Sequence, residues 1–186
     1  MRNRALIVVD MLNDFVDPRG ALYFPSASDI VPYVKVWLKK ARTEKDLIVF
    51  LCDSHKKDDL EFQRFPEHCV AGTWGAEIVP ELTPNTAAWR TGGGFEYVVK
   101  KSRYSGFFQS NLEHILKKHL SGVPSWEAGV EVVGVCTSIC VMDTVGGLAN
   151  RDYRILVPHH GVADFDNHAH EMALARMEKL YGANIV

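Results

Sequence analysis

Short apolar runs alternate with amphipathic stretches along this chain, and this alternation constrains the fold more than any other feature. The runs are rich in β-branched residues and are typical of buried strands, whereas the stretches between them carry apolar residues at helical spacing. We expect strands at residues 5–10, 47–52, 97–99, 129–135, 153–158 and 183–186. We expect helices at residues 29–42, at 111–120, from the turn at Cys140 to about 150, and at 166–181. This order predicts an α/β fold built on a mainly parallel, six-stranded sheet.

Length and composition indicate one soluble domain that acts on a small molecule. The chain has 186 residues, of which 47% are hydrophobic, so we expect a single domain over residues 1–186. A formal net charge of -2 does not favour nucleic acid or an anionic membrane as a partner. Asp10 interrupts the first apolar run before it reaches signal-peptide length, so we expect a cytoplasmic protein. The four cysteines do not resemble a secreted disulfide framework and are expected to be thiols.

The stretch GVCTSICVMDT, residues 134–144, places Cys140 at a turn between a buried strand and a helix. Thr137, Ser138 and Asp143 are residue types that favour the start of a helix. Backbone N–H groups at such a turn are unpaired within the helix and can stabilise a thiolate or an oxyanion, which would suit a nucleophilic Cys140. The alternative is an inert core thiol, because cysteine is often buried for packing alone.

Ionisable residues follow four of the predicted strands. Asp10 ends the first strand, Asp53 and His55 follow the second, Lys101 follows the third and Cys140 follows the fourth. In open parallel sheets, ligands bind beyond the carboxyl ends of the strands. We therefore expect these side chains to meet at one edge of the sheet, where a carboxylate, a lysine and a thiol join an Asp/His pair.

The Asp/His pair has the features of a metal site. Asp53 and His55 are separated by one residue, so an extended segment would direct both side chains to one side, and His68 follows after a loop. One carboxylate with two imidazoles suits a divalent transition metal, and zinc, iron and manganese all fit this donor set. The irregular stretch over residues 54–94 is also long, as functional loops usually are.

Four local patterns together resemble one enzyme family. They are VVDMLNDF at Asp10, CDSH with FPEHCVAGTWGAE, KSRYSGFF at Lys101, and VVGVCTSICV at Cys140. In order and spacing they resemble the cysteine hydrolases of the isochorismatase-like family, and within it they look most like the nicotinamidases. The resemblance covers nearly the whole chain and implies a doubly wound sheet with helices on both faces, as in a Rossmann-like three-layer sandwich. It also implies a homo-oligomer, because relatives often are.

The resemblance implies roles for the residues at the sheet edge. It makes Asp10, Lys101 and Cys140 the catalytic triad, and the alignment on RYSGF favours Lys101 over the neighbouring Lys100. It also implies an oxyanion hole from the backbone N–H groups of Cys136 and Cys140, with a cis peptide bond between Val135 and Cys136. Cys136 therefore serves as a backbone donor in this interpretation, in preference to a metal ligand or a disulfide partner.

The metal site and the pocket also follow from the resemblance. Asp53, His55 and His68 match the nicotinamidase metal site, where one divalent ion, with zinc expected, holds the ring nitrogen of the substrate. Glu61 is a fourth ligand in some members, although a solvated loop carboxylate is the alternative. Three aromatic residues match or flank positions that line the pocket, although each could belong to the core instead. They are Phe15, Phe65 (where tryptophan is common) and Tyr104.

These residue types suit hydrolysis of an amide. Cys140 would attack the carbonyl carbon as a thiolate, while Asp10 would accept the thiol proton and return it to the departing ammonia. Lys101 as an ammonium ion would favour the thiolate and stabilise the charge that develops during attack. Water would then hydrolyse the thioester and release the acid.

Other histidine and glycine residues have no assigned part in this site. After the fifth strand the chain reads PHHGVADFD, where His159, His160 and Asp164 could lie at the pocket rim or at a subunit contact. His168 and His170 are expected at the surface of the last helix. The glycines at 92–94 have no helix after them, so they predict a turn and not a phosphate-binding loop. Trp126 could lie in an exposed loop or at a subunit contact.

Three functions remain open at this stage. The first is a metal-dependent nicotinamidase that converts nicotinamide to nicotinate and ammonia. The second is another amidohydrolase of the same family, acting on a small amide such as a carbamoyl compound, since the triad fits it equally well. The third is a non-catalytic relative that keeps the fold, because a fold alone does not establish activity.

Overall fold

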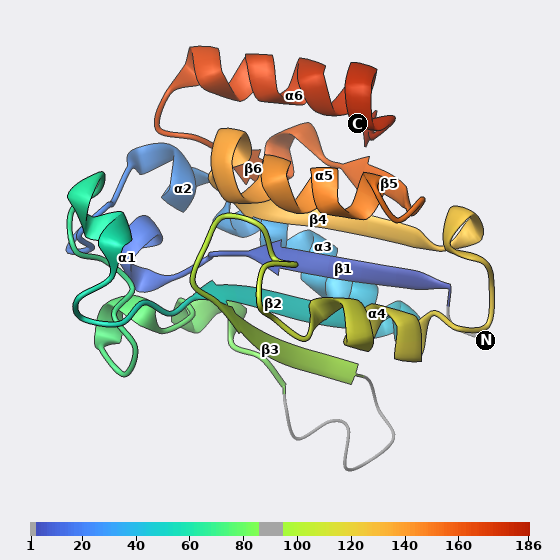
Figure 1. The fold of residues 1–186 in the computed structure, drawn as a ribbon, viewed down its shortest axis with the longest axis horizontal. Coiled ribbons are helices and arrows are strands. Elements are labelled where there is room, and N and C mark those ends of the chain that lie inside the picture. Colours follow the sequence, from blue (N-terminus) through green and yellow to red (C-terminus); the bar gives the residue numbers. More distant parts are fainter. Residues whose placement is uncertain (1–2, 86–94) are drawn as a thin grey trace.

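The computed structural model describes residues 3–85 and 95–186, and a parallel β-sheet forms its central layer. The strands follow the spatial order β3-β2-β1-β4-β5-β7, and each neighbouring pair is parallel (Figure 1). The strands on this path are β1 Arg4–Val9, β2 Leu47–Asp53, β3 Phe95–Lys101, β4 Gly129–Val135, β5 Arg154–Val157 and β7 Asn184–Ile185. The predicted parallel α/β fold is therefore confirmed.

Within residues 3–85 and 95–186 the sheet has seven strands, one more than the six predicted. The additional strand, β6, consists only of Val162 and Ala163 and pairs with the last two residues of β4. Strand β5 pairs only with the first half of β4, and β6 continues the same edge in the same direction after the 3₁₀ turn His159–Gly161. A strand of two residues has no periodicity to reveal it in a sequence.

The four predicted helices are present close to their expected positions, and two short helices near the N-terminus were not predicted. The helices are α1 Asn13–Val16, α2 Pro25–Asp29, α3 Val31–Glu44, α4 Leu112–His119, α5 Met142–Ala149 and α6 Asn167–Tyr181. Two helices, α2 and α3, lie where one was predicted to begin at Asp29, and each has a proline in its first turn, where the missing N–H costs nothing. The side chain of Asp166 caps α6 by accepting hydrogen bonds from the backbone of His168 and Ala169.

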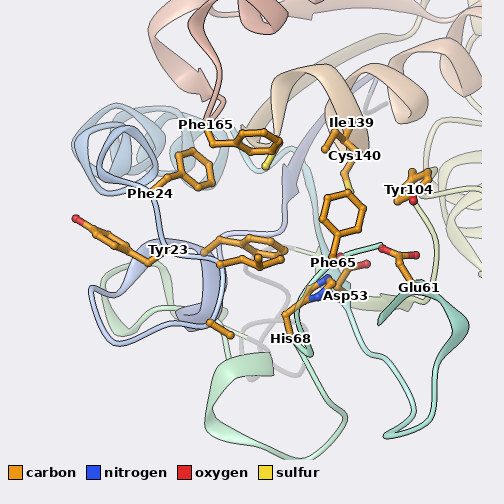
Figure 2. A pocket seen from close by; sticks show the side chains of 14 residues that line it. Tyr23, Phe24, Asp53, Glu61, Phe65, His68, Tyr104, Ile139, Cys140 and Phe165 are labelled. Carbon is orange, nitrogen blue, oxygen red and sulfur yellow. The ribbon is translucent and has the colours of Figure 1, made fainter. Parts of the chain in front are cut away.

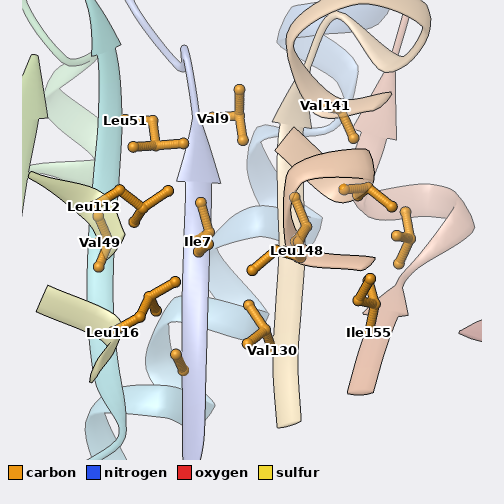
Figure 3. Close-up of a cluster of buried hydrophobic side chains, with 14 of the residues drawn as sticks. Ile7, Val9, Val49, Leu51, Leu112, Leu116, Val130, Val141, Leu148 and Ile155 are labelled. Carbon is orange, nitrogen blue, oxygen red and sulfur yellow. The ribbon is translucent and has the colours of Figure 1, made fainter. Parts of the chain in front are cut away.

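Helices cover both faces of the sheet, and the alternation of side chains along each strand supplies a core to each face. On β1, Ile7 and Val9 point into a cluster with α4, α5 and α6, whereas Leu6 and Val8 point into a cluster with α2 and α3. Figure 3 shows the first cluster, in which Leu112 and Leu116 of α4 lie over the strands. The apolar runs therefore form a central layer that is buried on both sides.

The winding of the chain reverses between β1 and β4. From β1 the chain adds β2 and then β3 on one side, and later adds β5 and β7 beyond β4 on the other side (Figure 1). In doubly wound sheets the crevice beyond the carboxyl ends of strands at such a reversal is the usual place for a ligand. The fold therefore directs attention to the residues that follow Val9 and Val135.

Three smaller observations bear on the sequence expectations. No helix in residues 3–85 or 95–186 is long and apolar enough to span a membrane. Trp126 lies in a 3₁₀ turn, Ser125–Glu127, and is 63% exposed. The turn predicted at residues 92–94 falls outside the described residues.

Gly134 is required where β4 approaches β1. Its φ is +116°, and a Cβ added there would lie 2.0 Å from the carbonyl oxygen of Val9. We therefore expect Gly134→Ala to lower the free energy of unfolding by an amount on the order of 3 kcal/mol, through backbone strain and overpacking. Gly129→Ala, in the same strand, is the matched control because its nearest neighbour is a side-chain carbon of Arg4 at 3.8 Å. Urea denaturation of the two variants measures the difference, and equal stabilities would contradict the prediction.

Candidate active site

The structure brings the four predicted strand-end residues together at the carboxyl edge of the sheet. Asp10 directly follows β1, and Asp53 and Lys101 are the last residues of β2 and β3. Cys140 lies in the turn after β4. All four are buried, and the polar atoms of Asp10, Asp53 and Cys140 lie within 4.8 Å of one another. This cluster lies at the reversal of winding, where the parallel sheet predicts a site.

Lys101 is at the centre of this cluster. Its Nζ lies 2.7 Å from Oδ2 of Asp10 and 2.6 Å from Oδ1 of Asp53, and it donates to Sγ of Cys140 at 3.3 Å. Burial alone would lower the pKa of Lys101, but the two carboxylates outweigh it and raise the pKa well above the ordinary value. The side chain is therefore a buried ammonium ion that contacts both candidate catalytic partners.

Asp10 is placed to exchange a proton with Cys140. Burial and the nearby charge of Asp53 raise the pKa of Asp10 to about 6, despite the opposing effect of Lys101. Oδ1 of Asp10 also accepts a hydrogen bond from the backbone N–H of Asp53 at 2.8 Å. A carboxyl group with a pKa near neutrality can act both as a base and, once protonated, as an acid.

The environment of Cys140 favours the neutral thiol over the thiolate. Burial raises its pKa well above the ordinary value, and the opposing charge of Lys101 does not compensate. The sequence expectation that Lys101 favours the thiolate is correct in direction, but it underestimates burial. The carboxylate of Asp10, which lies within 4.8 Å of the thiol, is therefore the candidate base for its proton.

The turn that carries Cys140 differs from the predicted helix start. The peptide bond between Val135 and Cys136 is cis, as the family resemblance implied, and a π-helix, Thr137–Val141, precedes α5. The backbone N–H groups of Ile139 and Val141 both donate to the carbonyl of Cys136 at 3.1 Å. The turn begins at Thr137, within the predicted helix entry, although no side chain caps this start. Single π turns occur frequently at functional sites.

Asp164 anchors this turn, a role that the sequence did not reveal. Its Oδ2 accepts a hydrogen bond from the backbone N–H of Ser138 at 2.7 Å, and its carbonyl accepts one from the hydroxyl of Ser26 at 2.8 Å. The side chain is buried, and the next residue, Phe165, lines the pocket. His170 also contacts the turn, because its Nδ1 lies 2.9 Å from Oγ1 of Thr137, and it is half-buried and not at the surface as predicted.

Asp53, His55 and His68 form a buried group of potential metal ligands. Their ligand atoms lie within 4.8 Å of one another. Nδ1 of His55 is 3.2 Å from Oδ2 of Asp59, and Nδ1 of His68 is 2.8 Å from the carbonyl oxygen of Pro66. These partners engage one nitrogen of each ring and leave each Nε2 as the available ligand, which is the usual arrangement around a metal-binding histidine.

Two buried polar atoms show that this group fits a cation. Within the described residues, Nε2 of His55 and Oε2 of Glu61 have no hydrogen-bond partner. Glu61 is buried, and burial raises its pKa, so it is not the solvated loop carboxylate of the alternative interpretation. Its Oε1 lies 4.0 Å from Nε2 of His55. Buried groups of this kind are costly unless a partner satisfies them, and a divalent ion would do so.

Asp14 holds the loops around the pocket and was missed in the sequence. Its Oδ2 accepts from the backbone N–H of Cys69 at 2.6 Å, next to His68, and its Oδ1 accepts from Ala21 at 3.1 Å. One carboxylate therefore joins the loop that carries His68 to the segment at Ala21, which lines the pocket. Asp14 belongs to the VVDMLNDF pattern, four residues after Asp10. The neighbouring sequence, however, is equally consistent with a carboxylate that only stabilises the start of a helix.

A pocket of about 350 Å³ opens over the cluster (Figure 2). The predicted residues Phe15, Phe65 and Tyr104 all line it. The sequence did not assign its other apolar wall, which consists of Ala21, Leu22, Tyr23, Phe24, Ile139 and Phe165. Cys140, Asp53 and His68 reach the same space, so the thiol and the potential metal ligands face one chamber. Its size and its apolar wall with few polar groups are typical of a small-molecule site.

Aromatic rings surround His68 on several sides. Phe15, Phe62 and Phe65 meet its ring edge-on, with centroids at 5.7, 5.6 and 6.3 Å. These contacts fix the imidazole and place flat apolar surfaces beside it. The pocket can therefore accept a planar ring with a polar group directed at the histidine.

The chain belongs to the isochorismatase family. The family described as Isochorismatase domain matches residues 4–186. The site therefore lies in an isochorismatase-like hydrolase fold, with nicotinamidase-like proteins among its relatives.

Solved structures that are similar to this chain include amidases of two kinds. A nicotinamidase/pyrazinamidase from Bacillus subtilis is 31% identical, with all of both chains covered and a TM-score of 0.87. A pyrazinamidase from Pyrococcus horikoshii in complex with zinc is 31% identical, covering 99% of this chain and 98% of that one, with a TM-score of 0.84. An N-carbamoylsarcosine amidase from Thermoplasma acidophilum is 33% identical, covering 100% and 95%, with a TM-score of 0.81. All three support a hydrolase of small amides.

Lys101 should be essential for the stability of the cluster. We expect Lys101→Met to lower the free energy of unfolding by about 3–5 kcal/mol, because it leaves two buried carboxylates without their cation. Lys100→Met is the matched control, since Lys100 is exposed and lies one residue earlier on the same strand. Guanidinium denaturation at neutral pH measures both, and a large loss in the Lys100 variant alone would show that the assignment is shifted by one residue.

Proposed function

We propose that this protein is a metal-dependent nicotinamidase that hydrolyses nicotinamide to nicotinate and ammonia. One observation carries the proposal: the thiol of Cys140 lines the same aromatic pocket as Asp53 and His68, which belong with His55 to the group of potential metal ligands. The thiol cluster supplies amide hydrolysis, and the second group supplies a means to hold a nitrogen-containing ring. The similarity to nicotinamidase and pyrazinamidase structures supports the same substrate class.

The pocket suits the pyridine ring of nicotinamide. Phe15 and Phe65 lie beside His68, so a flat ring placed there would contact aromatic surfaces. Asp53, His55 and His68, with Glu61 beside them, would hold a divalent ion, for which we propose zinc. When bound, the ion would supply a Lewis acid for the ring nitrogen. The aromatic walls would then direct the carboxamide group toward Cys140.

The residues around Cys140 can carry out both halves of the reaction. Asp10 removes the thiol proton as Sγ attacks the carbonyl carbon, and the same proton passes to the amide nitrogen as the C–N bond breaks and ammonia leaves. A water molecule, deprotonated by Asp10, then attacks the thioester, which releases nicotinate and returns the thiol. The ammonium group of Lys101 stays charged throughout and offsets the negative charge that forms beside it.

The turn after β4 would stabilise the tetrahedral intermediate. We propose that the backbone N–H groups of Cys136 and Cys140 donate to its oxyanion. Both residues line the pocket, and the π turn Thr137–Val141 connects them. Preorganised backbone donors of this type are typically worth about 2.7–4 kcal/mol of transition-state stabilisation.

The second candidate is hydrolysis of a carbamoyl compound. The N-carbamoylsarcosine amidase from Thermoplasma acidophilum shares the fold over the whole of this chain, and the triad would serve that reaction equally well. The unsatisfied Nε2 of His55 and Oε2 of Glu61 favour nicotinamide, because these buried atoms call for a cation. A panel of nicotinamide, pyrazinamide and N-carbamoyl amino acids distinguishes the two.

Cys140 and the metal should both be required for activity. We expect the zinc-loaded protein to release ammonia from nicotinamide, Cys140→Ala to reduce kcat/KM by roughly 10³-fold or more, and chelation to abolish activity until zinc is restored. Cys52→Ala is the matched control, because it also removes a buried thiol, but one that packs in the core cluster on the other face of the sheet. We expect this variant to retain activity. Absence of nicotinamide hydrolysis by the zinc-loaded wild type would reject the proposal.

The affinity of the proposed catalytic metal site should depend on Asp59. This carboxylate contacts Nδ1 of His55 and both of its oxygens lie 3.0 Å from Nη1 of Arg103, so it orients the imidazole. We expect Asp59→Asn to weaken zinc binding by about 10–100-fold, as measured by competition with a chromogenic chelator. Asp58→Asn is the control, because Asp58 is the exposed neighbour. Equal affinities for the two variants would show that Asp59 does not support the site.

A further inference from the structure

A second group of potential metal ligands lies outside the pocket. Ligand atoms of His159, His170 and Glu171 lie within 4.8 Å of one another. His159 belongs to the 3₁₀ turn His159–Gly161 that follows β5, and the other two residues lie on α6. This group shares no residue with Asp53, His55 and His68, and nothing in the proposed hydrolysis of nicotinamide uses it.

The donor set and spacing suit a transition metal. Two imidazoles and one carboxylate are typical ligands of zinc and of similar divalent ions. In tetrahedral zinc sites, bonds of 2.0–2.1 Å separate neighbouring ligand atoms by about 3.3 Å. Nε2 of His159 lies 3.5 Å from Oε1 of Glu171, close to this spacing. The side chain of Glu171 is 67% exposed, so it can rotate to close the remaining distance, and solvent can supply a fourth ligand.

The hydrogen bond of His170 provides an independent argument. Its Nδ1 lies 2.9 Å from Oγ1 of Thr137, which is fully buried. If the hydroxyl accepts from Nδ1–H, the proton is fixed on that nitrogen and Nε2 keeps its lone pair. Metal-binding histidines commonly donate their second ring nitrogen in this way. A simple surface ion pair between His159 and Glu171 would not require a third residue, His170, whose ring is oriented by a hydrogen bond.

We propose that His159, His170 and Glu171 bind a divalent transition metal ion of the zinc class. The ion would join the turn after β5 to the first turns of α6. Since His170 contacts Thr137, and Thr137 begins the π turn that carries Cys140, the ion would also fix the outer support of that turn. His160 is not part of the group, because its ring stacks on Tyr33 with centroids 5.6 Å apart.

The test compares the zinc content of matched variants. Wild type, His159→Ala and His168→Ala are dialysed against buffered zinc, and bound zinc per chain is measured by inductively coupled plasma mass spectrometry. We expect His159→Ala to bind one ion fewer than wild type, whereas His168→Ala should equal wild type. His168 is exposed on the same helix and lies outside the group, so it controls for adventitious surface binding. Equal zinc content in wild type and His159→Ala would overturn the proposal, as would an equal loss in His168→Ala.

The comparison is independent of the proposed catalytic metal. His68→Ala should lose the ion in the pocket and retain the ion at α6. If the wild type binds only one ion, the variant that loses it, His68→Ala or His159→Ala, shows which site holds it. Glu171→Gln provides a second variant at an exposed position if His159→Ala does not fold, as checked by circular dichroism. Thr137→Val should weaken zinc binding at α6 by about 10–100-fold while His170 remains in place. Unchanged affinity in that variant, with unchanged zinc content in Glu171→Gln, would reject the site.

Discussion

The buried ammonium group of Lys101 is the interaction on which the site depends. It joins the ends of three neighbouring strands, because its partners Asp10 and Asp53 follow or end β1 and β2 while Lys101 ends β3. Without this cation, two carboxylates would face each other in a dry interior, where neither could remain ionised without a large cost. The positive charge of Lys101 lowers the pKa of Asp10 against the effect of burial, to about 6, which suits a group that accepts and returns a proton. Sγ of Cys140 lies 3.3 Å from the same charge. The same ion pair therefore supports the sheet edge and the chemistry that we assign to it.

Asp53 connects the thiol cluster to the proposed metal site. Its Oδ1 contacts Lys101 at 2.6 Å, while its Oδ2 lies 3.7 Å from Nε2 of His55. Three buried carboxylates, of Asp10, Asp53 and Glu61, surround this region, and Lys101 balances only one of their charges. A divalent cation would balance the other two and would also satisfy Nε2 of His55 and Oε2 of Glu61. Charge and hydrogen bonding thus lead to the same conclusion, and the ion we propose for binding the substrate also has a structural reason to be there.

The sequence predicted what depends on local pattern and missed what depends on contacts between distant segments. Hydrophobic periodicity located the strands, and the rule that parallel strands share a carboxyl edge brought Asp10, Asp53, Lys101 and Cys140 together correctly. The anchoring roles of Asp164 and Asp14 could not be predicted because their partners, at Ser138 and Cys69, are 26 and 55 residues away. The raised pKa of Cys140 was also out of reach, since its largest cause is burial, which strand order does not specify. The two-residue strand β6 exists only because it lies beside the end of β4.

Asp164 makes the position of the nucleophile and the shape of the pocket interdependent. Its side chain holds Ser138, two residues before Cys140, whereas its backbone carbonyl is bound by Ser26 in α2. Phe24 directly precedes α2 and Phe165 directly follows Asp164, and their rings meet edge-on with centroids 6.1 Å apart in the pocket wall. A shift of this wall would therefore pull on the turn that carries the thiol. Because His170 supports the same turn from α6 through Thr137, the nucleophile is held from both sides by segments remote in sequence. Such support from several elements is what keeps a reacting atom within the narrow range of positions that attack on a carbonyl requires.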